Sequence, residues 1–101
     1  MGTRLELQTK LEELLGSRNV YYQPAENLQM KYPAIRYQKA DDITYHGDDI
    51  KYLNRNRYDI TVIDTLPDNK VIDAILALPY SSFDRHYTAN NLNHDVIRLY
   101  F

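Results

Sequence analysis

The sequence FDRHYTANNLNHDVIRLYF, residues 83–101, decides the fold because two alternating segments flank one turn. Apolar and polar side chains alternate on both sides of Asn90-Asn91, which is typical of strands with one covered face. Asparagine tolerates the left-handed backbone that a tight hairpin requires. The segment therefore predicts a β-hairpin, whose covered side chains are expected to be Phe83, Tyr87, Ile97, Leu99 and Phe101.

The N-terminal residues have the pattern of an amphipathic helix. Thr3 and Glu6 form a capping box, in which a hydroxyl and a carboxylate satisfy free amides at a helix start. Gly16 suits the position that follows a helix. The leucines between them recur at the spacing of one helical face and predict a buried stripe of Leu7, Leu11, Leu14 and Leu15.

Three short segments rich in β-branched or aromatic residues predict further strands. Residues 20–22 and 33–37 form the first two, and a proline is tolerated at the first position of the second. Residues 57–64 are expected to form a central strand. Residues 39–56 are polar and longer than an ordinary connection, which predicts a projecting hairpin or a functional loop.

A second helix is expected from Pro67-Asp68 to Pro79, with Val71, Ile72, Ile75 and Leu78 on its covered side. The order is then helix, strand, strand, long loop, strand, helix, strand, strand, within one domain that spans residues 1–101. Because most connections are of the hairpin type, we predict an α+β fold, a mainly antiparallel sheet covered by two helices.

Charge and composition exclude several classes of protein. Lys and Arg number 12 and Asp and Glu 14, a net charge of −2 that argues against a general nucleic-acid binder. The chain has no cysteine, so it has neither a disulfide framework nor a thiolate site. Without an apolar run of about 18 residues, we expect a soluble product with no membrane partner. Its ten tyrosines suit half-covered sheets and protein interfaces.

Two groups of residues are of the types that bind metals. Asp84 and His86, two apart in a strand, are expected to share a face, and His94 and Asp95 to point to opposite faces. Two or three ligands are fewer than a closed zinc site needs, which favours a solvated hairpin. The second group, Asp41, Asp42, Asp48 and Asp49, offers the oxygen ligands that Mg²⁺ and Ca²⁺ prefer, but its spacing is not that of an EF-hand.

A further segment, residues 52–58, interleaves aromatics with arginines, as single-strand binders do. The four aspartates beside it make a poor electrostatic groove, so we expect it to lie at a strand edge.

Several segments together resemble the tail terminator group, small tail-completion proteins of long-tailed bacteriophages and prophages. They are the N-terminal helix, YPAIRYQ (residues 32–38) with the long polar loop after it, RNRYDITVIDTLPDN (residues 55–69) and LPYSSFDRHYTANNLNHDVIRLYF (residues 78–101). The resemblance implies an α+β subunit that forms a ring, expected to be a hexamer, at the head-proximal end of the tail tube. Such a ring ends tube polymerisation and offers a docking face to the head connector.

The resemblance also implies no catalytic residue and no cofactor, and it places the protein in the virion tail after assembly in the host cytoplasm. Its partners would be its own copies, the tail tube protein and the connector or neck proteins, with DNA passing through the lumen unbound. Carboxylates that repel phosphates would ease that passage. We therefore expect a loop facing the lumen or the adjoining subunit, formed by Asp41, Asp42, Tyr45, Asp48, Asp49 and Tyr52.

Three alternatives remain open at the level of sequence. One is another neck component, a head-closure or head–tail joining protein. A second is a small metal-dependent enzyme using Asp84, His86 and His94. The third is a module that binds a peptide by adding a strand to its sheet edge.

Overall fold

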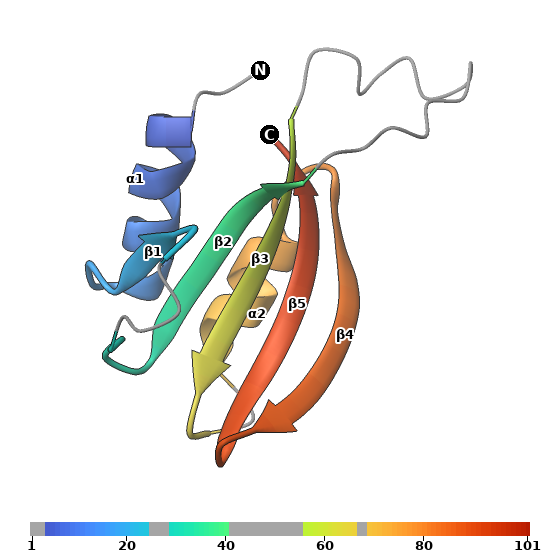
Figure 1. Cartoon of the computed structure of the whole chain (residues 1–101). Helices are drawn as coiled ribbons and strands as arrows, with labels where there is room; N and C mark the ends of the chain where they lie inside the picture. The colour runs from blue at the N-terminus through green and yellow to red at the C-terminus, as the bar shows by residue number, and fades with distance from the viewer. Residues whose placement is uncertain (1–3, 25–28, 41–55, 67–68) are drawn as a thin grey trace.

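A sheet with both helices on one of its faces forms the framework (Figure 1), in a computed structural model that describes residues 4–24, 29–40, 56–66 and 69–101. Within these residues the fold is α+β, as predicted. The elements are α1 (Arg4–Leu15), β1 (Val20–Tyr22), β2 (Ala34–Ala40), β3 (Arg57–Asp64), α2 (Lys70–Leu76), β4 (Ser81–Ala89) and β5 (Leu92–Tyr100).

The described sheet has five strands in the order β1-β2-β3-β5-β4. All neighbouring pairs are antiparallel except β1 and β2, which run parallel. β3 has a partner on each side, so the expected central strand is confirmed. The turn between β4 and β5 is also confirmed, because Asn90 and Asn91 have φ values of 54° and 63°, the left-handed conformation of a two-residue hairpin turn.

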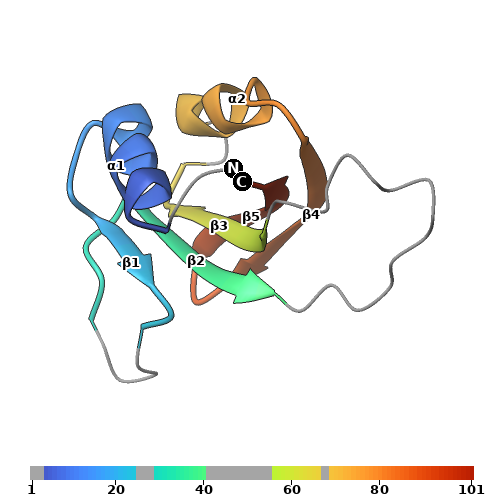
Figure 2. The ribbon, with the colours of Figure 1, turned by 90° about the horizontal axis from the view of Figure 1, so that it is seen from above.

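The helices lie side by side over one face of the sheet, α1 against β1 and β2 and α2 against β4 and β5 (Figure 2). Between helices and sheet lies the core, into which every second residue of β3 points. The buried members of this core are Leu7, Leu11, Val20, Ile35, Tyr37, Tyr58, Ile60, Val62, Val71, Ile75, Ile97 and Leu99.

The first helix agrees with its sequence pattern. Leu7 and Leu11 are fully buried, and Leu14 and Leu15 pack against the same core. Gly16 follows the helix with a φ of 79°, a conformation that glycine adopts without a Cβ penalty. Thr3 lies outside the described residues.

Two boundaries differ from the expectation. β2 begins after Pro33 and continues to Ala40, because it pairs with β3 over its whole length. α2 begins at Lys70 rather than at Pro67-Asp68 and ends at Leu76, although Leu78 still packs against the core. Of the expected loop 39–56, residues 41–55 lie outside the described residues.

Asn69 determines where α2 begins. Its side-chain oxygen accepts a hydrogen bond from the Val71 amide at 2.9 Å, which satisfies a free donor of the first turn. Its side-chain nitrogen donates to Asp64 Oδ2 at 2.7 Å. Asp64 is buried at the end of β3, so one asparagine both caps the helix and pairs an otherwise costly carboxylate.

Tyr37 anchors α1 to the sheet. Its hydroxyl donates to Gln8 Oε1 at 2.5 Å, and Gln8 Nε2 donates to the Val20 carbonyl at 3.0 Å, so α1 is tied to both β1 and β2. The ring lies 5.0 Å from that of Tyr22 and 6.1 Å from that of Tyr58. Burial raises the pKa of Tyr37 and of Tyr58 above the ordinary value of 10.0, because the phenolate would lose its hydration.

The substitution Asn69→Ala is expected to lower the free energy of unfolding by about 1–2 kcal/mol, since it removes the cap and leaves Asp64 short of a partner. Lys70→Ala, at an exposed neighbouring site, is the control and should change it by less than about 0.5 kcal/mol. Urea unfolding curves measure both. Equal losses in the two variants would contradict the role of Asn69.

Alkaline pH should destabilise the fold through the two buried tyrosines. Their pKa is raised in the folded state, so the free energy of unfolding is unaffected below pH 10.0 and falls as the pH rises above it. Urea unfolding at about pH 8 and about pH 11 measures how much the free energy of unfolding falls between the two. This fall should be smaller for Tyr37→Phe than for the wild type. Tyr32→Phe, at a site that is 42% exposed, should keep the full loss. The same loss in all three proteins would contradict this explanation.

Candidate functional site

The polar residues of the hairpin lie on both faces of the sheet, not in one cluster. Phe83 pairs with Ile97 and Arg85 with Val96, so Asp84 is an extra residue in a β-bulge. A bulge resets the alternation of the strand that contains it. The expectation that Asp84 and His86 share a face is therefore wrong.

His86 lies on the helix side of the sheet. Its Nδ1 is 2.7 Å from Oδ1 of Asp95, which is buried on the same side as Ile97 and Leu99. His94 points to the other side, as predicted, and its ring stacks on Tyr87 with centroids 4.6 Å apart and an interplanar angle of 11°. The proposed ligands Asp84, His86 and His94 thus do not converge. Among the described residues no group of three or more potential ligands gathers around a metal-sized site.

The prediction of covered side chains is also wrong for two rings of the hairpin. Phe83 and Tyr87 are 48% and 40% exposed, not covered as predicted. β4 is an edge strand, so its side chains have neighbouring strands on one side only. Tyr87 moreover lies on the face that neither described helix covers. Ile97 and Leu99 are buried as expected, and Phe101 is half-buried.

We call this uncovered side the open face; it carries Arg36, Gln38, Arg57, Asp59, Thr61, Asp84, Arg85, Tyr87, His94, Val96 and Arg98. The register sets these residues in rows across the strands. One row runs Arg36, Thr61, Val96, Arg85, and a second runs Gln38, Asp59, Arg98, Ser82. Because Thr61 and Val96 are small, the first row is low in its middle and high at both ends.

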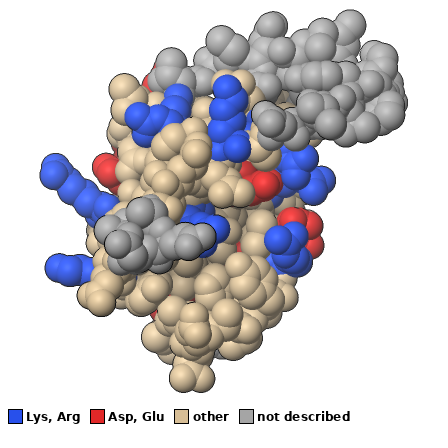
Figure 3. All heavy atoms as spheres, viewed as in Figure 1, with Lys and Arg blue, Asp and Glu red and all other residues tan. Residues whose placement is uncertain are grey.

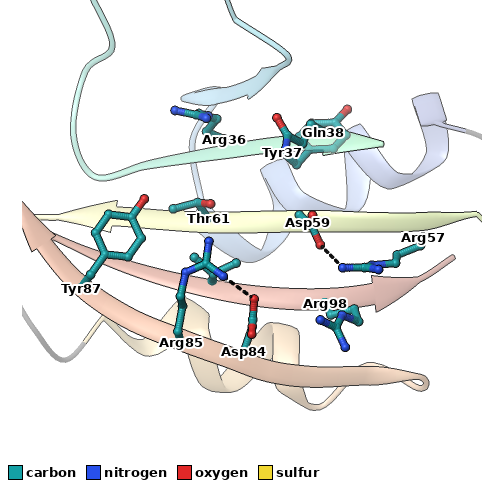
Figure 4. Close-up of a pocket in the computed structure, with 11 residues that line it drawn as sticks. Arg36, Tyr37, Gln38, Arg57, Asp59, Thr61, Asp84, Arg85, Tyr87 and Arg98 are labelled. Carbon is teal, nitrogen blue, oxygen red and sulfur yellow. Dashed lines mark hydrogen bonds and ion pairs between the residues drawn. The ribbon is translucent and has the colours of Figure 1, made fainter. Parts of the chain in front are cut away.

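The result is a hollow of about 280 Å³ on the open face, lined mainly by polar side chains (Figure 4). Thr61 and Val96 lie toward its floor, and Arg36 and Arg85 come from the strands on either side. Tyr87 stands at one end, while Asp59 and Arg98 lie toward the other.

Cations exceed anions in this hollow. Four arginines and two aspartates line it, a local balance of 4 − 2 = +2 in a chain of net charge −2. Arg57 pairs with Asp59 at 3.4 Å and Arg85 with Asp84 at 2.9 Å. Arg36 and Arg98 have no carboxylate partner among the described residues. The same side of the molecule shows several blue Lys or Arg side chains and fewer red ones (Figure 3).

Within the described part of the chain, two nitrogens of arginines that line the hollow lack hydrogen bonds. Nε of Arg57 and Nε of Arg98 are buried and have no partner among the described residues. A guanidinium nitrogen without a partner favours an anion that can accept its hydrogen bond. The chemistry available here is thus recognition of an oxyanion.

Apolar side chains are exposed on two other surfaces. The first, the β4 edge, carries Phe83, which is 48% exposed and lies on the helix side, where it pairs with Ile97. The second, the α1 groove, is lined by Leu5, Glu6, Thr9, Lys10, Glu13 and Phe101. Leu5 is 65% exposed there. α1 lies over the β1 and β2 part of the sheet, whereas β4 forms the opposite edge (Figure 1).

The acidic-loop residues proposed from sequence, Asp41, Asp42, Tyr45, Asp48, Asp49 and Tyr52, lie outside the described residues. Sequence reasoning missed the arginines of the open face. Each of Arg36, Arg57 and Arg98 sits beside core residues in an alternating strand, which is a signal for the uncovered face. That they meet in one hollow follows only from the strand register.

No protein family matches this chain, and no curated protein or solved structure is significantly similar to it. No helix of the described residues is long and apolar enough to cross a membrane.

Zinc titration should show no site that depends jointly on the hairpin residues, because these point to different faces of the sheet. Calorimetry of the wild type and of Asp84→Ala, His86→Ala and His94→Ala is expected to give four indistinguishable zinc isotherms. A stoichiometric site lost in all three variants would overturn the placement of these side chains.

Proposed function

We propose that this chain is a ring-forming structural subunit of a phage or prophage tail, a tail terminator that caps the tail tube at its head-proximal end. The sequence resemblance suggests this role. The structural observation that supports it best is the pair of unlike apolar surfaces, the β4 edge and the α1 groove, on different parts of the fold.

Unlike surfaces favour a ring over a two-fold dimer. In a two-fold dimer the same patch meets itself, whereas a head-to-tail interface joins two different patches and closes into a ring when the rotation allows. Phe83 of one subunit would pack into the α1 groove of the next, around Leu5 and Phe101. A ring then covers both apolar surfaces of every subunit, and no copy keeps an unpaired one.

The shape of the β4 edge also favours contact through side chains. An edge strand offers unpaired amides and carbonyls to an added strand unless a bulge interrupts it. The bulge at Asp84 does so here and leaves only residues 85–89 beyond it in regular pairing with β5. At this edge of the sheet, the bulge argues against peptide binding by strand addition.

In the proposed ring, the loop with Asp41, Asp42, Tyr45, Asp48, Asp49 and Tyr52 faces the lumen or the adjoining subunit. The outer faces of the ring meet the tail tube protein and the head connector or neck proteins. The subunit needs no cofactor for this role, and its place is the virion tail.

The wild type should form a concentration-dependent, ring-sized species in size-exclusion chromatography with light scattering. Phe83→Asp and Leu5→Asp should each be monomeric, since each places a charge in one half of the interface. Gln38→Asp, on the open face outside both apolar surfaces, is a control for the added charge and should still form rings. Circular dichroism checks that all variants are folded.

A mixture of the two monomeric variants distinguishes the interface type. Phe83→Asp keeps its α1 groove and Leu5→Asp keeps its β4 edge, so one head-to-tail contact can form and the mixture should yield a one-to-one dimer that grows no further. A mixture that stays monomeric, or a wild type that is monomeric at all concentrations, would contradict the proposal. The proposed role in capping the tail tube is tested by adding wild-type rings to polymerising tail tubes, whose growth should stop.

A further inference from the structure

We propose that the open face binds a nucleotide unit, with its phosphate held by Arg36 and Arg98 and its base lying on the stacked pair of Tyr87 and His94. The site is separate from both surfaces of the proposed ring, so it stands or falls independently of that proposal.

The guanidiniums supply the charge. Arg57 and Arg85 already have carboxylate partners, whereas Arg36 and Arg98 have none among the described residues. The two uncompensated cations line the same hollow and come from β2 and β5, with β3 between them. Two strand spacings and an offset of one row along the strands separate their backbones by about 12 Å, a span that two arginine side chains bridge when they bind one oxyanion.

The buried Nε nitrogens are hydrogen-bond donors that an anion in the hollow could pair. Nε of Arg98 and Nε of Arg57 have no partner among the described residues, and both side chains line the hollow. An oxyanion placed in it would satisfy donors that otherwise carry a cost of burial. The non-bridging oxygens of a phosphate offer more acceptor positions than a carboxylate does, which suits several donors converging from neighbouring strands.

The aromatic pair distinguishes a nucleotide from an acidic peptide. Tyr87 lines the hollow, and His94 covers one face of its ring in parallel stacking. Tyr87 is still 40% exposed, so part of its ring is accessible to a ligand. Protein sheets that bind single strands combine such aromatic platforms with cations that hold the backbone, whereas carboxylate side chains gain nothing from an aromatic ring.

Size argues for a single unit and against a duplex. A hollow of about 280 Å³ is at the small end of ligand pockets and suits one nucleotide-sized group. Bases within a duplex are already stacked on each other and cannot lie on Tyr87. A net charge of −2 also weakens any long-range attraction for a duplex, so binding depends on the local contacts.

The test is fluorescence anisotropy with a labelled single-stranded DNA of about 12 nucleotides, a length that covers one binding site. Arg36→Gln with Arg98→Gln should weaken binding at least about tenfold and reduce the slope of log affinity against log salt by about 1.4, the value for two phosphate contacts on a single strand. The matched control, Arg18→Gln with Lys70→Gln, removes the same charge at exposed sites away from the hollow and from the α1 groove, and should change the affinity by less than about twofold. Arg36→Gln alone, at an exposed site, keeps the test valid if the double variant unfolds.

Competition identifies the ligand. If adenosine monophosphate displaces the strand, a free nucleotide is sufficient for binding. If adenosine monophosphate does not displace the strand, binding requires a strand. Both results support the site. Tyr87→Leu should weaken strand binding several-fold while it leaves inorganic phosphate binding unchanged. Three results would overturn the proposal: no binding of the strand, equal binding of a duplex, or equal displacement by polyglutamate.

Discussion

β3 pairs with β2 on one side and with β5 on the other, and every other feature of the molecule depends on that double pairing. Because side chains alternate along a strand, the register sends Tyr58, Ile60 and Val62 to the helices and Arg57, Asp59 and Thr61 to the open face. A slip of one residue would exchange the two sets and bury the charged one. The core and the arginine hollow are therefore two consequences of one register.

The same register also determines on which face each charged side chain lies, which the net charge of the chain does not show. Taken over the whole chain, the net charge of −2 argues against nucleic-acid binding. The sheet instead gathers four arginines and two aspartates on its open face, while Glu6 and Glu13 lie on α1. Electrostatic recognition acts over about 10 Å at ordinary salt, so the local arrangement matters more than the total.

Local patterns in the sequence were enough to predict most of the fold. The leucine stripe of α1, the Asn90-Asn91 turn and the β-branched run of β3 each depend on residues close together in the chain, and all three are confirmed. The bulge at Asp84 was missed because it arises from pairing with β5, which alternation within β4 does not reveal. Asn69 was missed as the cap because its second partner, Asp64, becomes its neighbour only in the folded chain. The hollow needs the relative register of four strands, which a single sequence does not specify.

In the proposed ring, unlike surfaces of neighbouring copies meet, the β4 edge against the α1 groove. The chain has no cysteine, so one introduced pair, Phe83→Cys with Thr9→Cys, reports on that contact without interference. After mild oxidation, non-reducing electrophoresis should show a ladder of covalent multimers that ends at the size of the ring, and neither single variant should form it. A double variant that stays monomeric, or a single variant that forms disulfide dimers as readily as the pair, would contradict the claim.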